Sequence, residues 1–106
     1  MRKRCEEILL QLGITPDLLG FTYIADIVDI INSEDTKMTA IYHAVANKHN
    51  SNWQRVERAV RHAISKANPR SKEFEELINA SLVKQSNGNI SNSAFLHTLA
   101  YRLREE

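Results

Sequence analysis

Apolar side chains recur at three- and four-residue steps along most of this chain, and that spacing places them on one face of an α-helix. The pattern is clearest in the segment 51–67, where the apolar positions are Trp53, Val56, Ala59, Val60, Ala63, Ile64 and Ala67. The opposite positions of this segment are Gln54, Arg55, Glu57, Arg58, Arg61, His62 and Ser65. Ser51 is placed as an N-cap, and Gln54 three residues later completes a capping-box pattern. The segment predicts a helix over 52–67 with an apolar back and an arginine-rich front.

The same spacing predicts five further helices, over residues 2–12, 21–32, 36–48, about 72–82 and 92–104. Helix 21–32 is apolar around most of its circumference and leaves only Asp26 and Asp29 for solvent, so we expect it to be the central helix. Gly20 is expected to separate this helix from a short turn. Alternating β-branched residues are scarce, and the chain has only three Gly and two Pro. The predicted fold class is all-α, with about six helices in one compact domain over residues 1–106.

Residues 37–67 have the spacing of a helix-turn-helix. In that motif a small residue of the first helix lets the second helix pack closely across it, and Ala46 is the candidate. Asn50 can adopt the left-handed backbone conformation that the turn needs. The outward residues of the second helix would enter a major groove of DNA, where arginine pairs with guanine and glutamate accepts from cytosine.

The net charge of +1 hides an uneven distribution. Residues 1–36 carry a balance of −4, residues 37–72 a balance of +7, and residues 73–106 a balance of −2. Because local charge decides where an anion binds, the middle third favours a polyanionic partner. Exposed arginines also serve solubility, however, and Glu57 with Arg61 is an ordinary i,i+4 ion pair. A solvated helix face and a protein-binding face therefore stand as alternatives to DNA binding.

Other classes of function find little support in the sequence. Cys5 is the single cysteine, which excludes an internal disulfide and a cysteine-based zinc site and suits a reducing compartment. The four histidines lack metal-ligand spacing, and no motif places a catalytic base, a phosphate-binding loop or a carboxylate pair. No apolar run approaches the roughly 18 residues that a membrane span needs. We therefore expect a cytoplasmic protein that is not an enzyme, with no catalytic residues, no metal site and no cofactor.

The core RVERAVRHAI, residues 55–64, closely resembles the recognition helix of the stage-zero sporulation protein A family, response regulators of endospore-forming bacteria. Further segments that resemble the C-terminal effector domain of that family are 12–16, 20–23, 41–42, 45–50, 92–95 and 99–104. The resemblance implies an all-helical domain of about six helices. It also implies binding of double-stranded DNA at a short box with a TGTCGAA-like core, in the control of transcription during sporulation.

The resemblance suggests a role for individual residues. The residues that match operator-facing positions, and that we expect to read bases, are Glu57, Arg58, Arg61 and His62. Arg58 is the first candidate for a guanine contact. The residues expected to contact phosphates are Lys48, Ser51, Asn52, Trp53, Gln54, Arg55 and Lys66, with the backbone amides of 51–53 included. The final helix matches one used between neighbouring domains on tandem sites, and the residues expected in such a homodimer contact are Phe95, Leu96, Leu99 and Leu103.

The sequence departs from the family pattern in three places. Residues 51–54 replace a lead rich in small residues, so Trp53 is either a core anchor, which we prefer, or a contact to the DNA backbone. Residues 68–71 replace a segment that contains tryptophan in the family. The chain starts about a dozen residues before the domain, so we expect it to act without a receiver, and without phosphorylation as the switch if it is a natural stand-alone protein. An alternative function is therefore a protein-interaction module that pairs with an intact sporulation regulator or with RNA polymerase.

Overall fold

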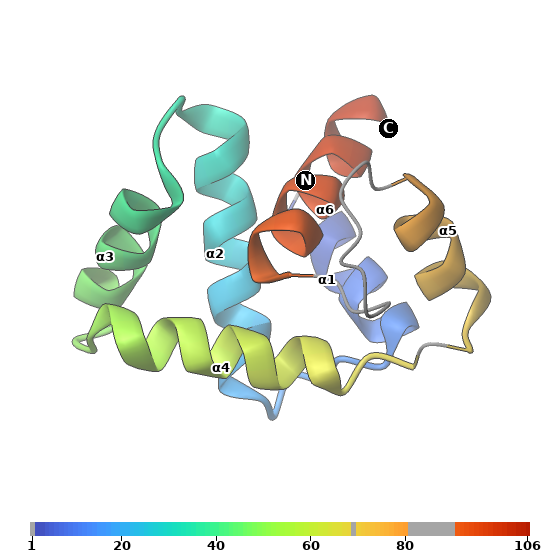
Figure 1. Ribbon diagram of the computed structural model, residues 1–106, viewed down its shortest axis with the longest axis horizontal. Helices are drawn as coiled ribbons and strands as arrows, with labels where there is room; N and C mark the ends of the chain where they lie inside the picture. Colours follow the sequence, from blue (N-terminus) through green and yellow to red (C-terminus); the bar gives the residue numbers. More distant parts are fainter. Residues whose placement is uncertain (1, 69, 81–90) are drawn as a thin grey trace.

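The computed structural model describes residues 2–68, 70–80 and 91–106, and all the regular secondary structure in this part of the chain is helical (Figure 1). The helices are α1 (Arg2–Leu12), α2 (Leu19–Ser33), α3 (Met38–Lys48), α4 (Trp53–Ser65), α5 (Lys72–Ala80) and α6 (Asn92–Glu105). The all-α prediction with six helices is confirmed. The predicted end of the fifth helix near Leu82 lies outside the described residues.

Helix α2 runs through the middle of the molecule and packs against α1, α3, α4 and α6 (Figure 1). Its side chains from Tyr23 to Val28 are all buried, which confirms that it is the central helix. The expectation that Asp26 faces solvent is wrong, because its side chain is only 3% exposed. Asp29, one turn further along, is 41% exposed and does reach the surface.

Gly20 lies in the first turn of α2 and not before it, so the expectation that it separates a turn from the helix is wrong. It is buried against α4. A Cβ atom at this position would lie 2.4 Å from the carbonyl oxygen of Ala59 and 2.5 Å from the Cβ of Ala63. The physical role of this glycine is therefore the close approach of two helix backbones.

Three of the helix ends are closed by local hydrogen bonds. Gly13 ends α1 with a φ of +94°, and the Ile14 amide donates to the Leu9 carbonyl at 2.9 Å, which is the Schellman arrangement. The Ser71 hydroxyl accepts from the Phe74 amide at the start of α5. The Ser91 hydroxyl does the same for α6 by accepting from the Ala94 amide.

Helix α6 packs against α2, α1, α4 and α5 with its apolar side. The four side chains that we expected in a homodimer contact, Phe95, Leu96, Leu99 and Leu103, are at most 5% exposed. Their assignment to a contact with a second copy is wrong, because they belong to the domain's own core. The exposed side of α6 includes His97, Tyr101 and Arg104.

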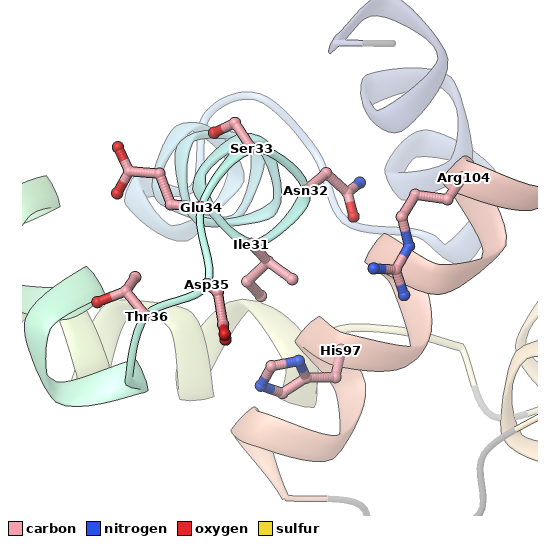
Figure 2. Close-up of a pocket in the computed structure, with 8 residues that line it drawn as sticks. All are labelled: Ile31, Asn32, Ser33, Glu34, Asp35, Thr36, His97 and Arg104. Atoms are coloured by element: carbon pink, nitrogen blue, oxygen red, sulfur yellow. The ribbon is translucent and has the colours of Figure 1, made fainter.

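A pocket of about 440 Å³ lies where the end of α2 and the following segment approach α6, remote from the end of α2 that packs on α4 (Figure 2). Its lining residues are Ile31, Asn32, Ser33, Glu34, Asp35, Thr36, His97 and Arg104. In Figure 2, the Asp35 side chain extends toward His97 of α6, whereas the Glu34 carboxylate points away from α6. The lining mixes both signs of charge and has no motif that would select a ligand.

Candidate nucleic-acid interface

Helices α3 and α4 are joined by a tight turn over residues 49–52 and pack against each other. Asn50 has a φ of +53°, as predicted from its ability to adopt the left-handed conformation. The Ser51 amide donates to the Ala46 carbonyl at 2.8 Å, and the Asn50 amide donates to the Asn47 carbonyl, so α3 ends in a Schellman motif. The expectation that the Ser51 amide contacts a phosphate is therefore wrong, because this amide already closes the turn.

The N-cap of α4 is Asn52 and not Ser51. The side-chain oxygen of Asn52 accepts from the Arg55 amide at 2.9 Å, and α4 begins at Trp53. The predicted capping box of Ser51 with Gln54 is wrong, because the Schellman turn uses Asn50 and Ser51 and the helix starts one residue later. The cap satisfies the backbone amide of Arg55 in the first turn of α4.

The back of α4 is formed by Val56, Val60 and Ala63, each with no exposed surface. They face the core formed with α2 and α3, as their spacing predicts. Trp53 is different: its side chain is 37% exposed, so our preference for a core anchor is wrong. Its indole lies beside the imidazole of His43 on α3, with ring centroids 6.2 Å apart. The two aromatic rings sit at the corner where α3 meets the start of α4.

The front of α4 carries cationic and polar side chains. The exposed residues among those assigned to DNA contact are Lys48, Asn52, Trp53, Gln54, Arg55, Arg58, Arg61, His62 and Lys66. Arg61 and His62 lie three and four residues after Arg58, so both are its neighbours on the helix surface. Glu57 is half-buried, and its carboxylate pairs with the Arg61 guanidinium. Its backbone carbonyl accepts from the Asn92 side chain of α6 at 3.3 Å.

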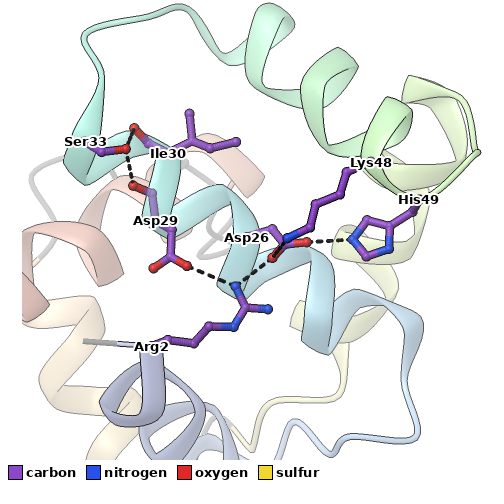
Figure 3. Close-up of polar contacts among 7 residues, drawn as sticks. All are labelled: Arg2, Asp26, Asp29, Ile30, Ser33, Lys48 and His49. Carbon is purple, nitrogen blue, oxygen red and sulfur yellow. Dashed lines mark hydrogen bonds and ion pairs between the residues drawn. The ribbon is translucent and has the colours of Figure 1, made fainter.

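A buried carboxylate stands behind the turn (Figure 3). Asp26 of α2 accepts from Arg2 of α1, from Lys48 at the end of α3 and from His49 in the turn. Burial alone would raise the pKa of Asp26, but the hydrogen bonds from His49, Arg2 and Lys48 outweigh it and hold the pKa below its ordinary value. Lys48, which we assigned to phosphate contact, is thus paired within the domain, although its side chain is 63% exposed.

Sequence reasoning missed this cluster because its members come from three separate elements. The signal that could have found it is the acidic residue Asp26 within an otherwise apolar stretch of α2. A carboxylate at such a position must have cationic or hydrogen-bonding partners, since burying it alone is very costly.

The part of the chain that the structure describes contains no reactive thiol, no metal site and no membrane-spanning helix. Burial raises the pKa of the Cys5 thiol to about 12, which makes it unreactive at neutral pH. No three His, Cys, Asp or Glu side chains of residues 2–68, 70–80 and 91–106 lie together as a metal site would require. None of the described helices has both the length and the apolar composition to cross a bilayer.

The geometry is therefore that of an amphipathic helix, held by an all-helical core, which presents a cationic face next to a tight turn. A family model described as "Sporulation initiation factor Spo0A C terminal" matches residues 5–103. This match covers nearly the whole of the 106-residue chain. The family consists of DNA-binding effector domains of transcription regulators, and it is not a family of enzymes. The chain belongs to the Spo0A C-terminal domain family.

Proposed function

We propose that residues 1–106 form a single helix-turn-helix domain that reads a TGTCGAA-like box through α4 and regulates transcription of sporulation genes in the cytoplasm. The observation that supports this proposal is the division of α4 into two faces. Val56 and Val60 are buried on one side, while Arg58, Arg61 and His62 are exposed on the other. Such a helix fits the major groove, which is about 12 Å wide and admits one α-helix.

In this proposal the base contacts come from the middle of α4. Arg58 donates two hydrogen bonds to O6 and N7 of a guanine in the box, and Arg61 and His62 contact neighbouring base edges. Glu57 accepts from a cytosine amino group, which requires it to share its carboxylate between the base and Arg61. These four residues decide which sequence is bound.

The phosphate contacts come from both ends of α4 and from the turn. Arg55 and Lys66 carry the charges at the two ends, and Trp53 and Gln54 lie in the first turn of the helix. Lys48 together with the side chains of Ser51 and Asn52 completes the set. These contacts set the register of α4 in the groove and carry no sequence information themselves.

The test is binding to a duplex that contains TGTCGAA, compared with a scrambled duplex of the same composition at several salt concentrations. We expect preference for the first duplex and a logarithmic salt slope of about 0.9 for each neutralised phosphate. Because Trp53 is the only tryptophan, its fluorescence reports the start of α4 directly. Equal affinity for both duplexes would refute the proposed box, and binding without a change in Trp53 fluorescence would refute its place at the DNA.

Pairing of neighbouring domains on tandem boxes is part of the same proposal, and so is contact with RNA polymerase. Since Phe95, Leu96, Leu99 and Leu103 are buried, such contacts must use exposed side chains. On α6, the exposed large hydrophobic side chain is Tyr101, at 52% exposed. The pairing is tested by the stoichiometry and cooperativity of binding to one box and to two adjacent boxes. Tyr101→Ala should lower the cooperativity and leave the affinity for a single box unchanged.

A further inference from the structure

We infer that Asp26 is a positioning residue for DNA recognition: its carboxylate fastens the end of α3 and the turn before α4 to the central helix. The inference rests on the proposed function, because it concerns how α4 is held for reading DNA. Asp26 itself is buried and does not touch DNA in this scheme. It acts through Lys48 and His49.

Both carboxylate oxygens of Asp26 are used (Figure 3). Oδ1 accepts from Nη1 of Arg2 at 2.6 Å and from Nζ of Lys48 at 3.1 Å. Oδ2 lies 2.6 Å from Nε2 of His49. Three elements that are separate in the sequence, namely α1, α2 and the α3–α4 junction, therefore meet at one side chain.

His49 is fixed to α2 by a second contact besides that with Asp26. Its ring meets the ring of Tyr23 edge-on, with centroids 5.1 Å apart. Tyr23 and Asp26 are three residues apart on α2 and thus point to the same side. His49 is also the C-cap of α3, and only Asn50, Ser51 and Asn52 separate it from the first residue of α4. Fixing His49 therefore fixes the point from which α4 begins.

The shared oxygen explains how Lys48 can both pair with Asp26 and contact DNA. The Lys48 side chain is 63% exposed, so its ammonium group lies at the rim of the domain. If it turns to a phosphate, Arg2 and His49 still compensate the buried carboxylate. In a variant that lacks Arg2, the movement of Lys48 to a phosphate would leave His49 as the remaining partner of the Asp26 carboxylate. A buried charge with so few partners is costly. Arg2 on α1 thus supports phosphate contact by a residue of another helix.

Asp29 provides a matched control. It lies one turn after Asp26 on α2 and binds the same Nη1 of Arg2, at 3.0 Å. It makes no contact with Lys48 or His49 among the described residues. Asp26→Asn and Asp29→Asn therefore remove the same charge from the same helix, and only the first disconnects the turn.

The experiment measures two quantities for the wild-type chain and both variants. The first is the ratio of affinities for the TGTCGAA duplex and the scrambled duplex. The second, measured without DNA, is the hydrogen-exchange rate of the Ser51 amide, which donates to Ala46 in the turn. For Asp26→Asn we expect the ratio to fall about fivefold, as one base contact is partly lost. We expect Ser51 exchange to rise about tenfold, as a charged hydrogen bond no longer closes the turn. Asp29→Asn should change neither quantity by more than about twofold.

The affinity ratio separates positioning from a loss of stability. A partly unfolded population lowers the apparent affinity for both duplexes by the same factor and leaves their ratio unchanged. An unchanged ratio in Asp26→Asn would thus overturn the positioning role, even if Ser51 exchanges faster. Should that variant fail to fold, His49→Gln breaks the same contact from a side chain that is 27% exposed, and the same two outcomes apply.

The failure of the proposed function is distinguishable from the failure of this inference. If the wild-type chain prefers neither duplex, the proposed box is wrong. Ser51 exchange then decides about Asp26 alone: faster exchange supports the fastening of the turn, and unchanged exchange overturns it.

Discussion

Helices α2 and α4 touch at Gly20, yet they use charge in opposite ways. On α2, the buried Asp26 is paired with the cationic Arg2 and Lys48 and forms a hydrogen bond with His49. On α4, Arg58 and His62 are exposed and form no ion pair with the described residues. The buried charge of α2 holds parts of the domain together, whereas the side chains on the front of α4 are exposed to solvent.

The difference follows from the cost of desolvation. A buried carboxylate must be paired in the native state, so its partners are chosen by the fold and are held at fixed distances. An exposed guanidinium keeps its water and loses little when it exchanges this water for a phosphate or a base edge. Substitutions on α2 should therefore change stability first, while substitutions on the front of α4 should change binding alone.

Replacing Gly20 by alanine should have the largest effect on stability among the variants proposed here, because the added methyl group pushes α2 and α4 apart. The new Cβ would meet the backbone oxygen of Ala59 at 2.4 Å, and backbone cannot turn away as a side chain can. We expect a loss of about 3 kcal/mol in the free energy of unfolding, measured by urea denaturation.

Two further variants test that explanation. Thr22→Ala places alanine at an exposed position of α2 and should be neutral within about 0.5 kcal/mol. Ala63→Gly combined with Gly20→Ala removes the contact to the Ala63 Cβ but not that to the Ala59 oxygen, so rescue should be partial. Complete rescue would mean that the backbone contact does not limit the approach of the helices.

Replacing Arg58 by alanine tests the opposite side of the comparison. We expect a loss of about 2 kcal/mol in binding to the TGTCGAA duplex, with relaxed preference at one base pair. The free energy of unfolding should change by less than about 0.5 kcal/mol, because the side chain is exposed. Titrations with duplexes altered at single positions locate the base pair.

Arg55→Ala is the matched control for Arg58→Ala, since it removes the same charge from the same helix. If Arg55 contacts a phosphate, the Arg55→Ala variant should lose the same factor in affinity for the cognate and the scrambled duplex. Its logarithmic salt slope should fall by about 0.9. If Arg58→Ala lowers the affinity for both duplexes by the same factor, Arg58 does not read a base.

Much of the fold could be predicted from periodicity, because the helices bury one face each. The back of α4 at Val56, Val60 and Ala63 is an example, and so is the left-handed Asn50, whose conformation depends on local chemistry alone. Trp53 is an exception. Its spacing continues the apolar stripe, but it occupies the first turn of α4, where its exposed ring lies beside His43 and not in the core.

Features that depend on distant residues could not be predicted. Asp26 looked like a solvent-facing residue, since its partners Lys48 and His49 are 22 and 23 positions away. Gly20 looked like a turn residue, because nothing in its neighbours announces the approach of α4. The base readers of the candidate site depend on a DNA partner, so the exposure of Arg58, Arg61 and His62 on α4 agrees with the prediction without testing it.

The pH dependence of stability tests whether the charge of Asp26 on α2 stabilises the fold. The pKa of Asp26 is lowered from its ordinary value of 3.8, so the carboxylate stabilises the fold above that pH and loses this contribution as the pH falls through the lowered value. At pH 7 we expect Asp26→Asn to be less stable by about 2 kcal/mol. The difference from wild type should shrink below about pH 4 and vanish when Asp26 is protonated. Thermal unfolding of both proteins between pH 7 and pH 2 measures this difference in stability. If the difference between wild type and Asp26→Asn stays constant over this range, the charge of Asp26 does not stabilise the fold.

A small effect on stability is expected from Glu57→Gln, because this half-buried carboxylate pairs within α4 and is also a proposed base contact. Glu57 is half-buried on α4 and pairs with the exposed Arg61, so losing the pair should cost no more than about 0.5 kcal/mol. Binding should respond more clearly, and its sign decides between two roles. If Glu57 accepts from a cytosine, affinity falls for the TGTCGAA duplex and rises for the scrambled one, since a negative charge near phosphates is gone. If affinity rises for both duplexes, Glu57 only restrains Arg61, and the reading surface of α4 is purely cationic.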